Sequence, residues 1–318
     1  MLQKKIISVT VPCYNEVSKI EAVITTMPKF VDHIIVVDDC SSDGTYELLQ
    51  SLKKKHKRLT VLQNPQNGGV GASIVTGYKH CRDLKHDIVV VMAGDGQMDP
   101  EDLPGLVQPI IDDKADYVKG NRFFTELGLK DIPKKRLFGN LILSALTKIA
   151  SGYWHVSDTQ CGYCAINLKA LKAVDWDECY PRYGCPNDYL TRLNISNMRV
   201  AERPVKPVYG PNWGSKMKIT RIIGPMLALL TRLTFTRIYK KYIFMNGHPL
   251  IFFFGFGLMF LLFAFLFLVR VIWVFVATGN TPIVSFIACG LFFISSLQFL
   301  LNAFSMDHQE NDHLSIRL

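Results

Sequence analysis

The chain has 318 residues, a formal net charge of +9 and a hydrophobic fraction of 49%. Such a length gives room for one large domain or two smaller ones. A basic balance fits nucleic acid or an anionic membrane surface. The apolar residues gather at the C-terminal end, which favours the membrane, so no nucleic-acid partner is expected. The eight cysteines do not make a disulfide scaffold, and free buried thiols are expected rather than a structural zinc site.

Strands and helices alternate through the first two thirds of the chain. Apolar runs predict strands over residues 6–12, 31–39, 59–63, 88–93, 116–122, 164–166 and 199–208. Helices are expected to end near residues 27, 53 and 81, to cover residues 137–150 and to begin at Tyr189. This order predicts an α/β domain with a parallel sheet and helices on its faces. No signal peptide precedes the first strand, so we expect this domain to stay in the cytoplasm.

Polar residues follow the buried strand over residues 88–93. Asp95 and Gln97 lie two positions apart at its carboxyl end, where ligands bind in open α/β sheets. A carboxylate and an amide oxygen, with room for phosphate oxygens, suit Mg²⁺ or Mn²⁺. Asp99 and Pro100 then predict a capped helix start. The simpler interpretation is a polar turn before that helix.

A glycine-rich turn over residues 67–72 follows the third predicted strand. Its spacing differs from the dinucleotide fingerprint, and no Gly-Lys-Ser/Thr follows it as in a Walker loop. What remains is a helix N-terminus whose bare amides can meet a negative group.

The C-terminal third has a different pattern. Residues 1–217 are expected to form the α/β domain and residues 218–248 a basic helical segment. Residues 249–306 are long and apolar enough for two transmembrane helices, at about 249–272 and 282–304, followed by a tail over 307–318. The basic residues before the first span predict that this side and the tail are cytoplasmic. Small residues from Ser285 to Ser296 predict close approach between helices, a feature that would favour oligomers.

Six stretches, taken together and in order, resemble family 2 glycosyltransferases of the GT-A fold, specifically the polyprenyl-phosphate glycosyltransferases. They are residues 11–16, 36–45, 67–72, 94–97, 120–122 and 214–216. The resemblance implies a Rossmann-like, mostly parallel GT-A catalytic domain followed by two C-terminal transmembrane helices. It also implies a homo-oligomer, in the form of a tetramer.

The resemblance assigns roles to individual residues. Nucleotide-sugar binding falls to Pro12, Tyr14, Asn15, Glu16, Asp39, Gly71, Asp95, Arg122, Ser215 and Lys216, and the divalent metal to Asp95 and Gln97. Tyr14 and Glu16 would face the base and ribose, and Asp39 would accept from a base N–H. Metal and Arg122 would offset charge on the leaving diphosphate.

The implied catalytic residues are Asp158, Asp188 and Arg122. Asp158 would position the acceptor, with Asp188 as the second candidate for that role. The alternative for Asp158 is a turn cap. Because a phosphate acceptor is already an anion, no strong general base is demanded.

The sequence also departs from the family pattern. Ala93 replaces the first acid of the usual Asp-x-Asp, which leaves fewer charged metal ligands. Cys164 replaces an arginine that often follows the Gly-aromatic pair. Asn212 and Trp213 stand where another arginine commonly precedes Gly-x-Ser-Lys.

The expected protein is an inverting glycosyltransferase in the cytoplasmic membrane, with its catalytic domain facing the cytoplasm. It would move a sugar from a nucleotide diphosphate sugar to a polyprenyl phosphate, undecaprenyl or dolichyl. UDP-glucose or UDP-N-acetylhexosamine is favoured over GDP-mannose. One alternative is a processive polysaccharide synthase, disfavoured because Gln-x-x-Arg-Trp is missing and two spans are too few. Another is an inactive GT-A domain that serves as a membrane scaffold.

Overall fold

Apolar residues alternate between the two faces of the central strands, so each face of one sheet can carry a hydrophobic core. The computed structural model describes residues 4–123, 134–206, 219–245 and 247–318. It divides into a first unit of residues 1–235 and 313–318 and a second unit of residues 236–312.

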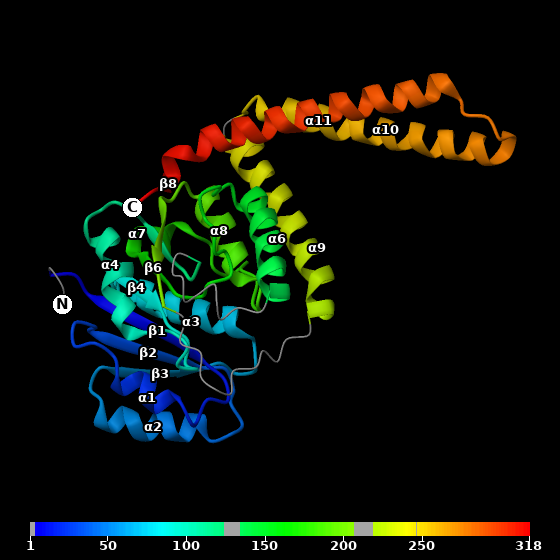
Figure 1. Cartoon of the computed structure of the whole chain (residues 1–318). Helices are drawn as coiled ribbons and strands as arrows, with labels where there is room; N and C mark the ends of the chain where they lie inside the picture. Colours follow the sequence, from blue (N-terminus) through cyan, green and yellow to red (C-terminus); the bar gives the residue numbers. More distant parts are fainter. Residues whose placement is uncertain (1–3, 124–133, 207–218, 246) are drawn as a thin grey trace. The chain divides into compact units, whose positions relative to one another are not determined.

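The first unit is built on a mixed sheet of eight strands in the order β3-β2-β1-β4-β6-β5-β7-β8 (Figure 1). The strands are β1 (Ile7–Cys13), β2 (His33–Asp38), β3 (Leu59–Gln63), β4 (Ile88–Val91), β5 (Tyr117–Asn121), β6 (Cys164–Asn167), β7 (Val200–Pro204) and β8 (Ser315–Ile316). Strands β1 to β4 are parallel, and β6 runs antiparallel to both β4 and β5. The predicted α/β class with a mostly parallel sheet is confirmed.

Helices cover both faces of the sheet (Figure 1). The helices up to residue 237 are α1 (Ile20–Thr25), α2 (Thr45–Lys55), α3 (Val70–Asp83), α4 (Leu103–Ile111), α6 (Lys134–Ser151), α7 (Leu168–Ala173), α8 (Cys185–Ile195) and α9 (Ile219–Arg237), the last of which packs against α6. One core holds Val9 and Val11 with residues of α1, α2 and α4. The other holds Val89 and Val91 with residues of α3, α7 and α8.

Two predicted boundaries are wrong at the C-terminal side of this unit. Helix α8 begins at Cys185 rather than Tyr189, because Pro186 falls in its first turn, where a missing N–H costs nothing. The strand expected over residues 199–208 ends at Pro204. Strand β8 was not expected: Ser315 and Ile316 pair in parallel with Val200 and Ala201.

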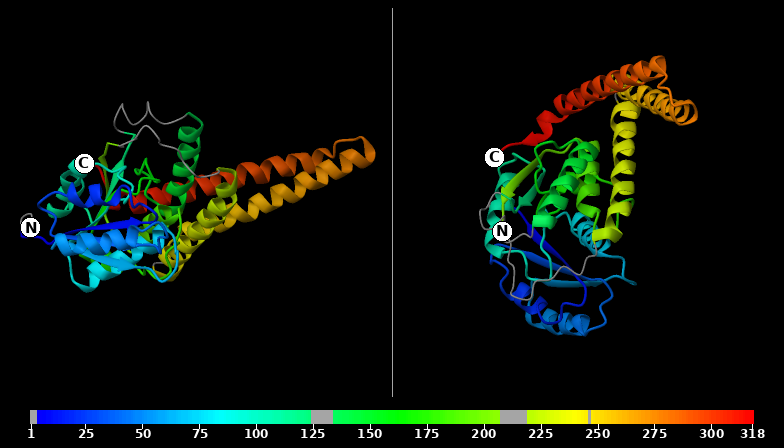
Figure 2. Two further views of the ribbon diagram at one scale, coloured as in Figure 1. Left: turned by 90° about the horizontal axis from the view of Figure 1, so that it is seen from below. Right: turned by 45° about the vertical axis from the view of Figure 1, so that its right-hand side comes forward.

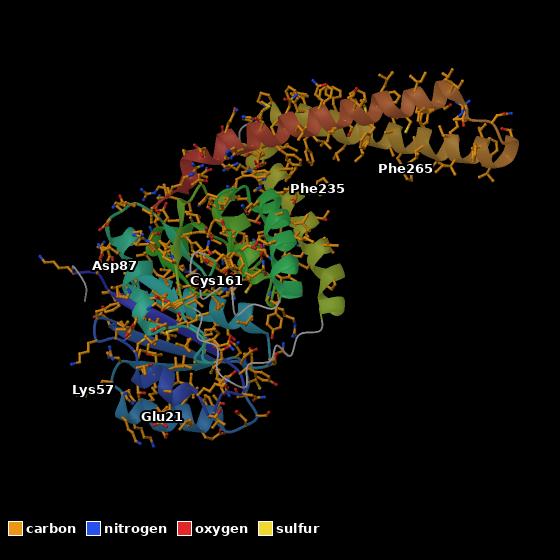
Figure 3. The ribbon with its side chains drawn as sticks, in the orientation of Figure 1. Glu21, Lys57, Asp87, Cys161, Phe235 and Phe265 are labelled. Atoms are coloured by element: carbon orange, nitrogen blue, oxygen red, sulfur yellow. The ribbon has the colours of Figure 1, made fainter. Side chains whose placement is uncertain are left out.

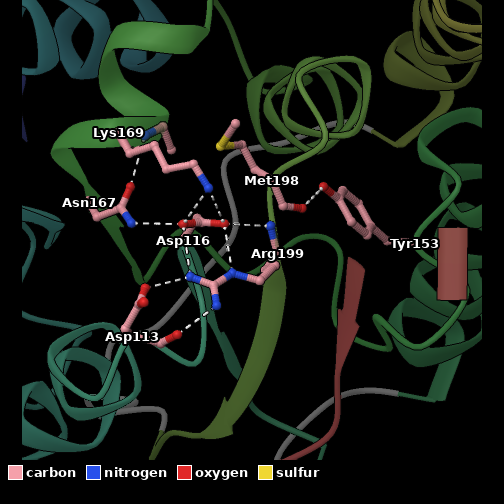
Figure 4. A network of polar contacts seen from close by, with 8 residues as sticks. Asp113, Asp116, Tyr153, Asn167, Lys169, Met198 and Arg199 are labelled. Carbon is pink, nitrogen blue, oxygen red and sulfur yellow. Dashed lines mark hydrogen bonds and ion pairs between the residues drawn. The ribbon is translucent and has the colours of Figure 1, made fainter. Parts of the chain in front are cut away.

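An ion network around the buried Asp116 links the starts of β5 and β7 with the end of β6 and with α7 (Figure 4). Asp116 accepts hydrogen bonds from the backbone and guanidinium of Arg199 and from Asn167, at 2.9 to 3.3 Å. Lys169 adds an ion pair at 3.4 Å, and Arg199 also reaches the exposed Asp113. These contacts hold the ends of three neighbouring strands in alignment.

The second unit contains a short π-helix (Ile238–Met245) and two long apolar helices, α10 (Leu250–Thr278) and α11 (Ile283–Asn311). Both long helices are long and apolar enough to cross a membrane, and both exceed the expected spans. They form a hairpin through Gly279, and they lie side by side in both views of Figure 2. Most of their apolar side chains point outward, Phe265 among them (Figure 3).

Small residues bring the two long helices together. The Ser296 hydroxyl donates to the carbonyl of Gly257 at 2.8 Å, and Ser285 and Ser296 are both buried. Phe260 packs between Phe292 and Phe299. The close approach predicted for residues 285–296 therefore occurs within one chain, and these small residues give no separate support for an oligomer.

Buried polar residues join the two ends of the hairpin. Arg237 donates to both carboxylate oxygens of Asp307, at 2.6 and 3.0 Å, and Tyr242 donates to the same group at 2.5 Å. Lys241 donates to Asn311 at 2.7 Å. Two cations of the predicted basic segment thus pair with the end of α11 instead of facing solvent.

Candidate functional site

A pocket of about 390 Å³ opens where β1, β2 and β4 end. Because these strands are parallel and adjacent, their carboxyl ends bring residues of three distant loops to one edge of the sheet. The lining residues are Pro12, Cys13, Tyr14, Glu16, Asp39, Asn67, Gly69, Val70, Ser73, Ala93, Gly94, Asp95, Arg182 and Tyr183. Five residues expected at a nucleotide site line it: Pro12, Tyr14, Glu16, Asp39 and Asp95.

Asn15 shapes the loop after β1 rather than the pocket wall. Its backbone has a φ of 56°, a conformation that asparagine tolerates better than most residues. Its side chain accepts from the Ser42 amide, and its own amide donates to the Ser41 hydroxyl, both at 2.9 Å. The Glu16 amide donates to Thr45 at 3.0 Å. These bonds hold Tyr14, which is 47% exposed, at the pocket edge.

Asp39 lines the pocket and is almost fully buried. One carboxylate oxygen accepts from Asn64 Nδ2 at 2.7 Å and from the Gly68 amide at 3.0 Å, and the other accepts from the Gly69 amide at 2.7 Å. Among the described residues the second oxygen accepts this one hydrogen bond, so it keeps a lone pair for a ligand. Charged hydrogen bonds of this kind hold a carboxylate in one orientation.

The start of α3 is not a set of bare amides. The Gly68 and Gly69 amides donate to Asp39, and the Ala72 amide donates to the carbonyl of Pro181 at 3.1 Å. The expectation of a bare anion site is therefore wrong at these three positions. Gly71 lies behind the pocket wall, and a Cβ there would come within 2.6 Å of the Tyr180 carbonyl. The lack of a Cβ at this position permits the close packing.

Asp95 faces the pocket in the turn after β4. Its Oδ1 accepts from the Gln97 amide at 3.1 Å, and Gly96 between them has a φ of +74°. Asp99 caps the next short helix by accepting from the Glu101 amide at 2.9 Å, as expected. Gln97 is partly buried beside the pocket, outside its lining.

The oxygen atoms at this turn suit a metal ion whose other coordination positions are filled by a bound ligand. In the described part of the chain, no three His, Cys, Asp or Glu side chains form a complete metal site. Mg²⁺ usually takes one or two carboxylates and fills its shell with water and substrate phosphate oxygens. Asp95, with the Gln97 amide oxygen nearby in sequence, fits such a partial site.

Arg122 and Asp158 form a buried pair outside the pocket lining. Arg122 donates to Asp158 through Nε at 2.7 Å, Nη2 at 2.9 Å and its backbone amide at 3.2 Å. Glu202 on β7 accepts from the amides of Ser157 and Asp158, at 2.9 and 3.1 Å, and from Asn121 Nδ2 at 2.9 Å. Burial raises the pKa of Glu202. Asp158 is thus held on two sides, with its carboxylate turned to Arg122.

Asp188 is buried in the first turn of α8, where its carboxylate braces the preceding loop. It accepts from the Tyr180 amide at 2.5 Å and from Arg192 Nε at 2.8 Å. Burial raises the pKa of Asp188, against the opposing effect of Arg192. Ser215 and Lys216 lie outside the described residues.

Arg182 and Tyr183 are pocket residues that the sequence reasoning missed. The signal available was the Pro-Arg-Tyr-Gly loop just before a predicted helix. That signal could not say which strand ends the loop would approach, because the loop meets α3 over a hundred positions away in the chain.

Comparisons with known proteins show what the chain as a whole is similar to. The family model described as "Glycosyl transferase family 2" matches residues 8–175. The chain is similar to UDP-N-acetylglucosamine–dolichyl-phosphate N-acetylglucosaminyltransferase of Methanococcus voltae, with 33% identity over 64% of this chain and 86% of that protein. Undecaprenyl-phosphate mannosyltransferase of Micrococcus luteus is 27% identical over 70% of this chain and 91% of its own.

A likeness in fold extends to a solved structure. Glucosyl-3-phosphoglycerate synthase of Mycobacterium tuberculosis, in complex with Mn²⁺, UDP and glucosyl-3-phosphoglycerate, has a TM-score of 0.53 and 19% identity. The match covers 74% of this chain and 80% of that one. At this identity the likeness concerns the fold alone.

Proposed function

The chain belongs to glycosyl transferase family 2, and from this premise we propose that it transfers a sugar from a nucleotide diphosphate sugar to a polyprenyl phosphate at a membrane. The observation that carries the proposal is the pocket at the ends of β1, β2 and β4, which brings Asp39 and Asp95 into one cavity. The two relatives named above support the acceptor class, since their names specify dolichyl and undecaprenyl phosphate.

The pocket suggests how the donor binds. Tyr14 and Glu16 lie on one loop and would contact the base and ribose. Asp39, held by three donors, would accept a hydrogen bond from a base N–H. Asp95 and Gln97 would hold Mg²⁺ or Mn²⁺ on the diphosphate. A uridine nucleotide is favoured, because the Methanococcus relative is named for a UDP sugar.

The reaction is a single displacement with inversion. An oxygen of the acceptor phosphate attacks the anomeric carbon while the bond from that carbon to the diphosphate breaks. Asp95 and Gln97 would hold a divalent metal, which would supply electrostatic stabilisation of the leaving group. Asp158 would orient the acceptor together with Arg122, because the two are already joined by three hydrogen bonds. Asp188 would act indirectly, by bracing the loop that carries Arg182.

The acceptor proposal also draws on the two apolar helices. Each is 29 residues long, which exceeds the roughly 20 residues that a bilayer core requires. Two spans return the chain to the side from which it entered. The pairing of β8 with β7, after both spans, is consistent with that topology. We propose that this side is the cytoplasm, and that the protein assembles as a homo-oligomer.

A substrate panel tests the proposal. Full-length protein in nanodiscs is supplied with UDP-glucose, UDP-N-acetylglucosamine or GDP-mannose, each with undecaprenyl or dolichyl phosphate. The expected result is one favoured donor and a lipid-linked sugar whose formation requires Mg²⁺ or Mn²⁺. Absence of lipid-linked product with every pair would favour the scaffold alternative, and a growing polysaccharide would favour the synthase.

A further inference from the structure

The loop over residues 180–183 forms one wall of the pocket. Arg182 and Tyr183 both line the cavity, and Tyr183 is 61% exposed. Neither residue belongs to a stretch that carries the family resemblance. Their side chains are accessible from the cavity, so a ligand there can meet both.

This wall is rigid at its backbone. The Pro181 carbonyl accepts from the Ala72 amide at 3.1 Å, and the Arg182 carbonyl accepts from the Cys185 amide at 2.9 Å. A Cβ on Gly69 would come within 3.0 Å of Arg182 Cγ, so the arginine stem lies directly on the start of α3. The buried Asp188 carboxylate accepts a hydrogen bond from the Tyr180 amide. The backbone of Arg182 is therefore held in place at the pocket wall, and its side chain can adjust to a ligand.

The charges around the cavity are unbalanced. Among the described residues of the lining, Glu16, Asp39 and Asp95 are acidic, whereas Arg182 is the one cation. The diphosphate of a nucleotide sugar is itself a double anion. Its entry among carboxylates is unfavourable unless positive charge meets it. Ala93 lines the pocket where the resembling family has a second metal-binding acid, so a metal would have fewer charged ligands here. A cationic side chain would then neutralise a larger share of the diphosphate charge.

We infer that Arg182 binds the diphosphate of the donor and determines affinity for it alongside the metal. The inference rests on the proposed function. A guanidinium presents several N–H groups in one plane, a geometry that matches two phosphate oxygens at once. Arg182 then stabilises the departing nucleoside diphosphate as well as the bound donor.

Equilibrium binding tests the inference without relying on turnover. UDP and GDP, and their parent nucleosides uridine and guanosine, are titrated onto full-length protein in detergent, with Mg²⁺ and again in chelator. Arg182→Ala is expected to weaken binding of the favoured diphosphate by about tenfold to a hundredfold, the usual range for a charged hydrogen bond. Nucleoside affinity should change less than twofold. The loss should persist in chelator, because Arg182 acts on the phosphate directly.

Two variants control for other effects. Arg182→Lys keeps the charge and should retain part of the affinity. Arg82→Ala removes a half-buried cation from the other end of α3, outside the pocket lining, and should leave binding unchanged. An equal loss of nucleoside and diphosphate affinity in Arg182→Ala, or no loss of either, would overturn the inference alone. Wild-type protein that binds neither UDP nor GDP would overturn the proposed function and the inference with it.

Discussion

Asp95 and Asp116 are both aspartates of the same catalytic unit, and their surroundings are opposite. Asp116 is fully buried and accepts hydrogen bonds from Arg199, Asn167 and Lys169. Asp95 lies in an open pocket and, among the described residues, accepts one hydrogen bond, from the Gln97 amide. A carboxylate whose lone pairs are filled by the protein stabilises the fold. One whose lone pairs face a cavity is available to a ligand.

The pKa of Asp116 agrees with this difference. Burial alone would raise the pKa of Asp116, but the hydrogen bonds from Arg199 and Asn167 outweigh burial and lower it to about 2. The pKa of Arg199 is raised through the same contacts. These are two descriptions of one interaction, whose contribution to stability is counted once. Removing Asp116 should therefore damage folding, and removing Asp95 should damage activity.

The largest effect is expected from Asp95→Ala. Loss of the metal's charge stabilisation should cost several kcal/mol of barrier, or about three powers of ten in turnover. The thermal unfolding midpoint should stay near that of wild type, because one local hydrogen bond is lost. Product formation and thermal melting of the same preparation measure both. Rapid turnover of this variant, or of wild type in excess chelator, would remove Asp95 and the metal from the reaction.

Asp116→Ala should show the reverse pattern. Breaking a buried ion pair leaves Arg199 without its buried partner and should lower the free energy of unfolding by about 3 kcal/mol. Turnover at low temperature should persist. The matched control is Asp113→Asn, which removes the charge of the exposed partner of the same arginine and keeps a residue that tolerates the φ of 54° at this position. That control should cost less than about 1 kcal/mol. Equal losses of unfolding free energy in urea would show that the buried Asp116 contributes no more than the exposed Asp113.

Acid should weaken the Asp116 network at a defined pH. The pKa of Asp116 is lowered to about 2 from an ordinary value of 3.8. Its contribution is therefore present above about pH 4 and is lost as pH falls toward 2, and it amounts to about 2 kcal/mol. Comparing urea unfolding of wild type and Asp116→Asn across this range isolates the term. A constant difference between them from pH 5 to pH 2 would show that Asp116 is not the titrating group.

Glu202→Gln should give the smallest effect. It tests whether Arg122 and Asp158 act in acceptor binding or only stabilise the fold. The glutamine has one oxygen where the glutamate has two. If that oxygen accepts from the Ser157 and Asp158 amides, the new NH2 group faces the Asn121 Nδ2 donor; if the side chain is turned round, the two amides lose their acceptor. Either arrangement should lower the free energy of unfolding by about 1 kcal/mol. Adding Asn121→Asp supplies an acceptor and should restore the network. A rise in acceptor KM with unchanged donor KM, reversed in the double variant, supports a role at the acceptor. A change in melting alone assigns the pair to the scaffold.

The pocket could be predicted because the end of each strand can be recognised from the few residues around it. The apolar runs before Tyr14, Asp39 and Asp95 located three strands, and parallel pairing brings their ends together. Arg182 was not predictable in this way, because its position depends on the packing of its loop against Gly69 and Ala72.

The same limit applies to Asp158 and to the sheet edge. No spacing rule shows that Asp158 faces Arg122, since the two lie 36 positions apart and meet through tertiary packing. Strand β8 was hidden because two residues are too short for a strand signal. Its pairing comes from the neighbouring strand β7.

Strand β8 has a consequence for biosynthesis. Strand β7 lies at the sheet edge until Ser315 and Ile316 pair with it, and those residues are translated only after both long helices. A nascent catalytic unit therefore keeps an unpaired strand edge, with its aggregation risk, while the two long helices are being synthesised. Closure of the sheet waits for the second helix to leave the ribosome. Pairing with Ser315 and Ile316 then covers the edge strand that carries Glu202.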